Sequence, residues 1–225
     1  MCNKVILLIV LLFSILHISI SPAFTKEPEN LHTLKQQVVF YHDSGECDFD
    51  QETVTQRARN YLEKRISNNN RLQNKERLAI VFDIDETTLS NYEHLFELNF
   101  GIIPQLVLEE IQKADDPAIK ATQRLYQYAR KQGIAVFFIT GRAEKLRVIT
   151  KKNLKSVGYD KWDGLYMKPN DYENKSVIPY KSSMRKIIQD MGYTIVVNIG
   201  DQFSDLAGGY AESVYKLPNP YYFIP

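Results

Sequence analysis

The sequence predicts a doubly wound α/β fold whose sheet is mostly parallel. Four short runs are apolar and rich in β-branched residues, as expected of strands buried on both faces of a parallel sheet. These runs span 78–82, 134–139, 164–167 and 194–199. Helical stretches alternate with them, and this order implies right-handed crossovers between strands. The 225 residues, 44% of them hydrophobic, suffice for one domain with a sizeable core.

The charge balance argues against one class of partner. Lys and Arg together number 28 against 27 Asp and Glu, so the formal net charge is +1. Domains that bind nucleic acid normally carry a clearly basic face. We therefore expect no nucleic-acid partner.

The first 23 residues have the organisation of a signal peptide. Lys4 precedes an uninterrupted apolar run at 5–13, and Ser21, Pro22 and Ala23 supply a small-residue cleavage site. This run is far shorter than the roughly 20 residues that span a bilayer. We therefore expect removal of 1–23, export to the periplasm or the medium, and no stable membrane anchor.

Residues 24–50 are polar and lack sustained periodicity, so we expect a loosely ordered N-terminal arm. The folded domain is then expected over 51–225. It begins with an amphipathic helix that has Asp50 as candidate N-cap and ends at 67–70. Apolar residues at helical spacing support this helix: Val54, Ala58, Tyr61, Leu62 and Ile66.

Three further helices are predicted between the strands. The first begins at Asp116 and Pro117, a cap followed by proline at the first helical position, and ends at Gly133. The other two are expected over 144–157 and 180–191. Each of them precedes a predicted strand, as the doubly wound fold requires.

Polar side chains gather where the predicted strands end. Asp83 and Asp85 follow the first strand and project to the same side if the backbone stays extended. The tripeptide Thr-Gly-Arg at 140–142 follows the second strand, and Asp201 and Asp205 follow the last. Ligands of such folds bind beyond the carboxyl ends of the strands. Taken alone, the Asp-x-Asp pair is equally explained by helix capping.

Four carboxylates at neighbouring strand ends would repel one another unless a cation lay among them. With oxygen ligands and no His or Cys beside them, Mg²⁺ is the expected ion. Mg²⁺ commonly shares its coordination between carboxylates, water and substrate phosphate, which indicates phosphoryl chemistry. Lys181, at the start of the helix before the last strand, is the expected cationic side chain.

In this order, the motifs resemble those of the haloacid dehalogenase (HAD) superfamily. They read D-I-D-E-T-T-L at 83–89, I-T-G-R at 139–142, Y-K-S at 180–182 and N-I-G-D-Q-F-S-D-L at 198–206. Their wording is similar to that of the subfamily IIIB acid phosphatases, which include bacterial class C acid phosphatases and plant vegetative storage proteins. The resemblance implies a HAD-like Rossmannoid sheet with a small helical cap inserted after the first motif strand, at about 92–125.

The resemblance implies an exported Mg²⁺-dependent acid phosphatase that hydrolyses phosphate monoesters, nucleotides among the candidates. Asp83 would be the nucleophile that forms an aspartyl-phosphate. Asp85 would protonate the leaving oxygen and then activate the hydrolytic water. Because Asp85 must enter the first step protonated, the highest activity is expected at acidic pH, unless a neighbouring carboxylate raises its pKa and broadens the range.

The same resemblance assigns the phosphate-binding groups. The Thr140 hydroxyl, the Gly141 N–H and the Lys181 ammonium would hold the equatorial oxygens, where charge must be compensated. Arg142 stays outside this set because a structural ion pair explains it equally well.

The metal would be held by an Asp83 oxygen, the backbone carbonyl of Asp85 and Asp201. Asp205 would lie behind these ligands, where it either orients Asp201 or pairs with Lys181.

Two other classes of function remain as alternatives. A non-catalytic storage or binding protein has the same fold, but the joint presence of Asp83, Asp85, Lys181 and Asp201 argues against it. A phospho-acceptor signalling domain also places Asp, Thr and Lys around Mg²⁺, but export and the Asp-x-Asp pair disfavour it. His94 is expected to be structural. Three aromatic residues of the predicted cap either pack together or stack on an aromatic substrate group: Tyr92, Phe96 and Phe100.

Overall fold

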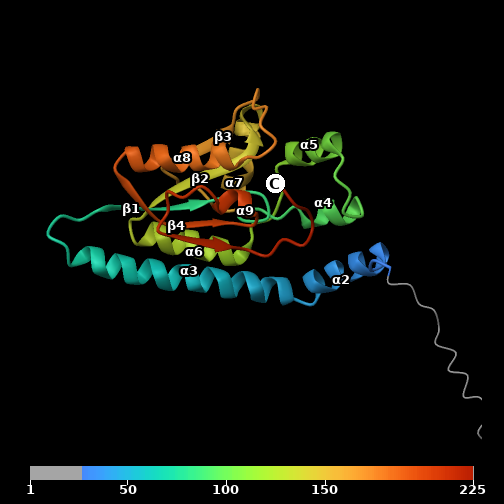
Figure 1. The fold of residues 1–225 in the computed structure, drawn as a ribbon, viewed down its shortest axis with the longest axis horizontal. Helices are drawn as coiled ribbons and strands as arrows, with labels where there is room; N and C mark the ends of the chain where they lie inside the picture. Colours follow the sequence, from blue (N-terminus) through green and yellow to red (C-terminus); the bar gives the residue numbers. More distant parts are fainter. Residues whose placement is uncertain (1–26, 225) are drawn as a thin grey trace, which may run out of the picture. The chain divides into compact units, whose positions relative to one another are not determined.

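The computed structural model describes residues 27–224, which contain a five-stranded sheet with all neighbouring strands parallel. The strand order is β3-β2-β1-β4-β5 (Figure 1). The strands are β1 (Arg77–Phe82), β2 (Ala135–Ala143), β3 (Gly164–Lys168), β4 (Tyr193–Gly200) and β5 (Ser213–Lys216). The predicted doubly wound fold is confirmed. The predicted signal peptide, 1–23, lies outside the described residues.

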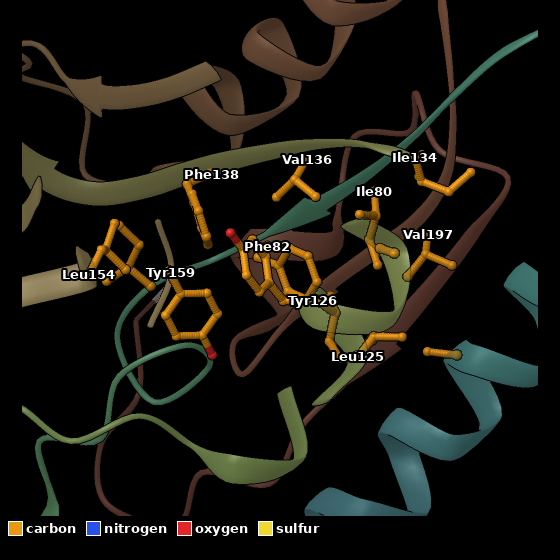
Figure 2. Close-up of a cluster of buried hydrophobic side chains, with 14 of the residues drawn as sticks. Ile80, Phe82, Leu125, Tyr126, Ile134, Val136, Phe138, Leu154, Tyr159 and Val197 are labelled. Atoms are coloured by element: carbon orange, nitrogen blue, oxygen red, sulfur yellow. The ribbon is translucent and has the colours of Figure 1, made fainter. Parts of the chain in front are cut away.

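Alternating side chains of the central strands fill two separate cores, one on each face of the sheet. Leu78, Ile80 and Phe82 of β1 face the first core, whereas Ala79 and Val81 face the second. β2 alternates in the same way. Figure 2 shows the first core, where side chains of β1 and β2 meet those of a covering helix: Ile80, Phe82, Val136, Phe138, Leu125 and Tyr126.

Helices cover both faces of the sheet, as Figure 1 shows. α3 (Glu46–Asn70) and α6 (Lys120–Lys131) pack on the first core, and α8 (Ile178–Asp190) packs on the second. The short turn η2 (Glu144–Leu146) leads into α7 (Arg147–Ser156), which adds a buried leucine to the first core. Two helices were predicted after the second and third strands, over 144–157 and 180–191. Counted together, η2 and α7 match the first to within one residue, and α8 matches the second to within two.

The N-terminal arm is helical, so the prediction of a loosely ordered segment is wrong. α2 (Leu31–Asp43) precedes α3, and Gly45 separates the two helices in the left-handed conformation, at φ 84°. α3 starts at Glu46, and Asp50 lies inside it, where it accepts a hydrogen bond from Tyr41 at 2.8 Å. Sequence periodicity did not reveal α2 because none of its residues is buried.

Two short helices stand beyond the carboxyl ends of the strands and form the cap (Figure 1). They are α4 (Tyr92–Glu97) and α5 (Pro104–Lys113), inserted between β1 and β2. The predicted cap reached 125, but α6 begins at Lys120 and packs against the sheet and α3. The predicted helix start at Asp116 is therefore wrong as well. The Asp116 carboxylate does not cap a helix but pairs with Arg142.

The C-terminal part contributes elements that the sequence did not announce. β5 is half-buried and pairs with β4 at the edge of the sheet, so no continuous apolar run marks it. The short helix α9 (Phe203–Leu206) follows β4, and residues 217–224, the C-terminal tail, return toward the cap. Among the described residues, no helix combines the length and the apolar content of a membrane span.

Candidate active site

Three adjacent strands bring the predicted site residues to one edge of the sheet. β1 pairs with β2 on one side and with β4 on the other. Asp83 directly follows β1, Thr140 lies near the end of β2, and Asp201 directly follows β4. The Asp83 N–H donates to the Ile199 carbonyl at 3.0 Å, so the ladder continues to the first motif residue. This edge is where the chain reverses its winding direction, the usual ligand position in such sheets.

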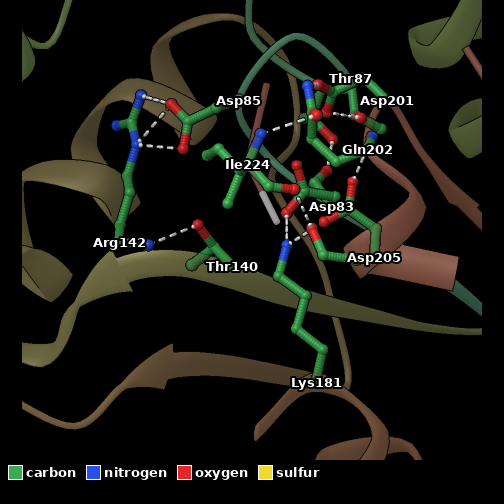
Figure 3. A network of polar contacts seen from close by, with 12 residues as sticks. Asp83, Asp85, Thr87, Thr140, Arg142, Lys181, Asp201, Gln202, Asp205 and Ile224 are labelled. Atoms are coloured by element: carbon green, nitrogen blue, oxygen red, sulfur yellow. Dashed lines mark hydrogen bonds and ion pairs between the residues drawn. The ribbon is translucent and has the colours of Figure 1, made fainter. Parts of the chain in front are cut away.

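A buried lysine connects two of the carboxylates. Lys181 Nζ, in the first turn of α8, lies 2.5 Å from Asp83 Oδ1 and 2.5 Å from Asp205 Oδ1 (Figure 3). Burial disfavours the ammonium form, but Asp205 and Asp83 together hold the pKa of Lys181 above its usual value. Asp205 approaches this closely because Gly200 has no side chain, since a Cβ there would lie 2.4 Å from Asp205 Cβ. Lys181 therefore holds Asp83 in position as a permanent cation.

Three donors fix the orientation of Asp201. Thr87 Oγ1 donates to Asp201 Oδ1 at 3.0 Å, and Gln202 Nε2 and Asn219 Nδ2 each donate to Oδ2 at 2.7 Å. Asn219 belongs to the C-terminal tail, which thereby becomes part of the site. The carboxylate is 1% exposed at the residue level, so its position is set by these contacts and not by solvent.

An arginine holds Asp85. Arg142 Nη2 and Nε lie 2.7 and 3.0 Å from Asp85 Oδ1, and Asn91 Nδ2 donates to the same oxygen at 3.2 Å. Burial favours the neutral carboxyl, but Arg142 outweighs it and holds the pKa of Asp85 below its usual value. A raised pKa of Asp85, which would have broadened the pH range of activity, is therefore not what the structure indicates. Arg142, left outside the predicted site, is in direct contact with the predicted acid.

The same arginine leads to the cap. Arg142 Nη2 lies 3.1 Å from Oδ2 of Asp116, a residue that is 1% exposed. His94 of α4 has Nε2 at 3.4 Å from Asp116 Oδ1 and Nδ1 at 3.0 Å from Glu110 Oε2 of α5. A continuous chain of polar contacts thus connects both cap helices with Asp85.

Asp83, Asp201 and Asp205 form a group that fits a divalent cation. One ligand atom from each lies within 4.8 Å of the others, and all three residues are buried. Burial, and next the charge of Asp205, raises the pKa of Asp83 above its usual value and that of Asp201 to about 6. Burial is the larger cause of both shifts, and the neighbouring negative charge adds to it more than Lys181 offsets. A donor set made only of oxygens suits Mg²⁺.

Comparison with known families decides the relationship. The model of the HAD superfamily, subfamily IIIB (Acid phosphatase), matches residues 20–225. The chain belongs to this acid phosphatase family. The resemblance inferred from the four motifs is confirmed, and it extends into the N-terminal helices.

Several relatives of this acid phosphatase family are similar over most of the chain. Acid phosphatase 1 of Solanum lycopersicum is 36% identical over 148 residues, which cover 64% of this chain and 58% of that protein. Vegetative storage protein 1 of Arabidopsis thaliana is 33% identical over 186 residues, which cover 81% of this chain and 67% of that protein. The class C acid phosphatase from Bacillus anthracis shares the fold, with a TM-score of 0.69 at 21% identity, over 84% of this chain and 86% of that one.

The remaining predicted phosphate-binding residues differ in exposure. Gly141 lines a cavity of about 1110 Å³, the catalytic cavity, together with Asp83 and Lys181. Thr140 is fully buried, and its Oγ1 accepts a hydrogen bond from the Arg142 N–H at 3.0 Å. Gly141 and Lys181 therefore face the cavity, and Thr140 supports the turn beneath it.

Two groups of site residues were missed by sequence reasoning. Thr87 was visible within the first motif, but its partner Asp201 lies 114 positions away. Gln202 directly follows Asp201 in the fourth motif but was given no role, and Asn219 carries no pattern that relates it to Asp201. The cap aromatics pack together, as one of the two alternatives expected. Phe100 stacks on Tyr221 with ring centroids 6.0 Å apart, and four more ring pairs connect the same cluster: Tyr92–Phe96, Tyr92–Phe100, Tyr92–Tyr221 and Phe96–Phe100.

Proposed function

We propose that the chain is an Mg²⁺-dependent acid phosphatase that hydrolyses small-molecule phosphate monoesters through an aspartyl-phosphate on Asp83. One observation carries the proposal. Asp83 Oδ1 is held by Lys181, whereas Oδ2 accepts no hydrogen bond from any described residue, and both Asp83 and Asp85 line the catalytic cavity. A carboxylate that is fixed at one oxygen and free at the other is suited to in-line attack on phosphorus.

The proposed reaction assigns a residue to each step. Asp83 Oδ2 bonds to phosphorus while the bond from phosphorus to the ester oxygen breaks, and Asp85 gives its proton to the departing oxygen. Asp85 then takes a proton from water, whose oxygen attacks phosphorus and releases inorganic phosphate from Asp83. Lys181 and the Gly141 N–H would bind the phosphate oxygens throughout.

The metal would be held by Asp83, the backbone carbonyl of Asp85 and Asp201. Bound there, Mg²⁺ supplies positive charge to the phosphate oxygens as charge develops on them. Thr87, Gln202 and Asn219 keep the Asp201 carboxylate oriented toward this position, and Asp205 acts through Lys181.

The test is a phosphatase assay on purified protein lacking 1–23, using p-nitrophenyl phosphate with Mg²⁺ and with EDTA. We expect hydrolysis with Mg²⁺ and its loss with EDTA. Asp83→Asn should lower kcat by about 10³-fold or more, because the amide is not a nucleophile. Asp190→Asn, an exposed carboxylate on α8, is the matched control and should retain full activity.

The same assay also tests the alternative, a non-catalytic storage or binding protein on this fold. A protein that is folded by circular dichroism but inactive with Mg²⁺ would support storage, the role that the name of the Arabidopsis relative gives to that protein. An Asp83→Asn variant that still hydrolyses the ester would refute the assignment of the nucleophile.

Export is part of the proposal. The predicted signal peptide, 1–23, supports it, and so does the relative named Stem 28 kDa glycoprotein of Glycine max, 35% identical over 181 residues, since glycoproteins mature in the secretory route. N-terminal sequencing of protein secreted by an expressing cell should begin near Phe24. Protein that stays in the cells with Met1 in place would contradict export.

A further inference from the structure

The catalytic cavity continues well beyond the carboxylates. Its volume of about 1110 Å³ is several times what a phosphate group needs, and one end holds Asp83, Asp85, Lys181 and Asp201. The remaining walls come from the cap and from the C-terminal tail. The part of the substrate that leaves with the ester oxygen must occupy this second region.

The cap wall is apolar and only partly covered by other parts of the protein. α5 presents Val107, Leu108 and Ile111 to the cavity on one helix face, yet no residue of this helix is buried. Leu98 and Ile102, from the segment between the two cap helices, extend the same wall. Apolar surface of this extent, left open to water beside a catalytic group, is the usual mark of a ligand-binding wall.

The opposite wall is apolar as well and is firmly attached. Phe223 and Ile224 of the tail line the cavity and remain 72% and 40% exposed. The tail is held by the residue after Asp201: the Ile224 N–H donates to Gln202 Oε1 at 3.1 Å, and Gln202 Nε2 donates to the Tyr222 carbonyl at 3.4 Å. The wall therefore has a fixed position relative to the carboxylates.

Polar groups on the cap side of the cavity already have partners. Asn91 donates to Asp85, His94 contacts Asp116, and Gln105 donates to Glu109 at 2.8 Å. The rings of Phe100 and Tyr221 are stacked on each other. On this side, a sugar or nucleoside would place most of its hydroxyl and base-edge groups against apolar side chains, which is unfavourable.

Three lysines line the rest of the cavity: Lys145, Lys168 and Lys175. They belong to η2, the end of β3 and the segment before α8. Their charge attracts the phosphate dianion of any substrate and does not distinguish one leaving group from another.

We propose that the site is selective for phosphate monoesters of bulky apolar alcohols or phenols, bound with the phosphate at Asp83 and the apolar group between α5 and the C-terminal tail. The inference rests on the function proposed above and specifies its substrate class. The reaction is unchanged: the phosphoryl group is transferred to Asp83 and then to water, and the apolar alcohol leaves with the proton from Asp85.

The test compares ethyl, butyl, hexyl and octyl phosphate, whose leaving alcohols have nearly the same basicity. We expect kcat/KM to rise about two- to fourfold for each methylene that the walls bury, so that hexyl phosphate exceeds ethyl phosphate by at least about tenfold. Adenosine monophosphate and glycerol phosphate are the polar competitors. A flat series, or a nucleotide hydrolysed better than hexyl phosphate, would overturn the proposal.

Substitutions place the selectivity in the cap. Leu108→Gln should lower the ratio of hexyl to ethyl kcat/KM at least about fivefold, since it introduces a polar group into the wall. Ile103→Gln makes the same kind of change at a residue that is 50% exposed and does not line the cavity, and it should keep the ratio. If Leu108→Gln does not fold, Ile102→Gln, at a 55% exposed position on the wall, replaces it.

The outcomes separate the two proposals. If the unmodified protein hydrolyses none of the esters in the presence of Mg²⁺, the proposed function fails. If it hydrolyses ethyl and octyl phosphate equally well, phosphatase function stands and the selectivity is refuted. An unchanged ratio in Leu108→Gln would refute the role of α5.

Discussion

The two ends of the catalytic cavity are built on opposite principles. At the carboxylate end, Asp83, Lys181, Asp201 and Asp205 are buried; short hydrogen bonds connect Lys181 with Asp83 and Asp205, and three other donors hold Asp201. At the cap end, apolar side chains such as Leu108 line the cavity from a helix with no buried residue. The first arrangement fixes the positions of the atoms that the proposed reaction uses, whereas the second leaves apolar surface for the proposed leaving group. Rate and selectivity should therefore respond to different substitutions.

Removing the buried cation should cost the carboxylate end more stability than any other change considered. Lys181→Met leaves Asp83 and Asp205 buried without their shared partner, which should cost about 3–5 kcal/mol of unfolding free energy and about 10²-fold or more in kcat. Urea denaturation and the phosphatase assay measure the two effects. Lys186→Met, which removes an exposed pair with Asp190 at 2.6 Å, should leave the free energy of unfolding essentially unchanged, because exposed ion pairs contribute little. Similar losses in both variants would contradict the role given to burial.

The pH profile tests the same end without mutation. Arg142 lowers the pKa of Asp85, so the protonated acid becomes scarcer with each pH unit above that value. We expect kcat/KM for alkyl phosphates to fall about tenfold or more from about pH 5 to about pH 8. The ratio of hexyl to ethyl phosphate should stay constant, because transfer of methylene groups does not depend on pH. A rate that rises steadily over this range would contradict Asp85 as the acid.

A substitution at Asp116, which lies between the two ends of the cavity, should have the smallest effect on kcat. Asp116→Asn removes one charge from the chain that connects Arg142 with His94 of α4. We expect kcat to fall about three- to tenfold for alkyl phosphates and less for p-nitrophenyl phosphate, whose good leaving group needs little protonation. Equal losses for both substrates would indicate a structural role for Asp116 alone. The ratio of hexyl to ethyl phosphate should not change.

Residues that directly follow the predicted parallel strands were predictable in position, because strand geometry and parallel pairing relate them. Asp83 and Asp85 follow a buried strand, and parallel pairing brings Thr140 and Asp201 to the same edge. The predicted helices of the sheet layer were also close to the observed ones. In contrast, α2 carries no buried face, so periodicity had nothing to detect.

Asp116 illustrates how a local pattern can mislead. Asp followed by Pro117 is a favourable helix start, yet α6 begins at Lys120 and the Asp116 carboxylate binds Arg142 instead. A buried guanidinium offers a carboxylate a stronger interaction than the N–H groups of a helix end. The prediction weighed only the local contact, because the distant one is invisible in the sequence.

The sequence by itself determined the fold class, the family and the carboxylates at the strand ends, since these depend on short-range periodicity and on motifs read in order. The tertiary structure alone decided which cation meets which anion. In the folded chain, Lys181 lies between Asp83 and Asp205, Arg142 pairs with Asp85, and Asn219 of the C-terminal tail donates to Asp201. Such contacts arise where segments far apart in the chain are packed together, and charges there select partners by distance and burial.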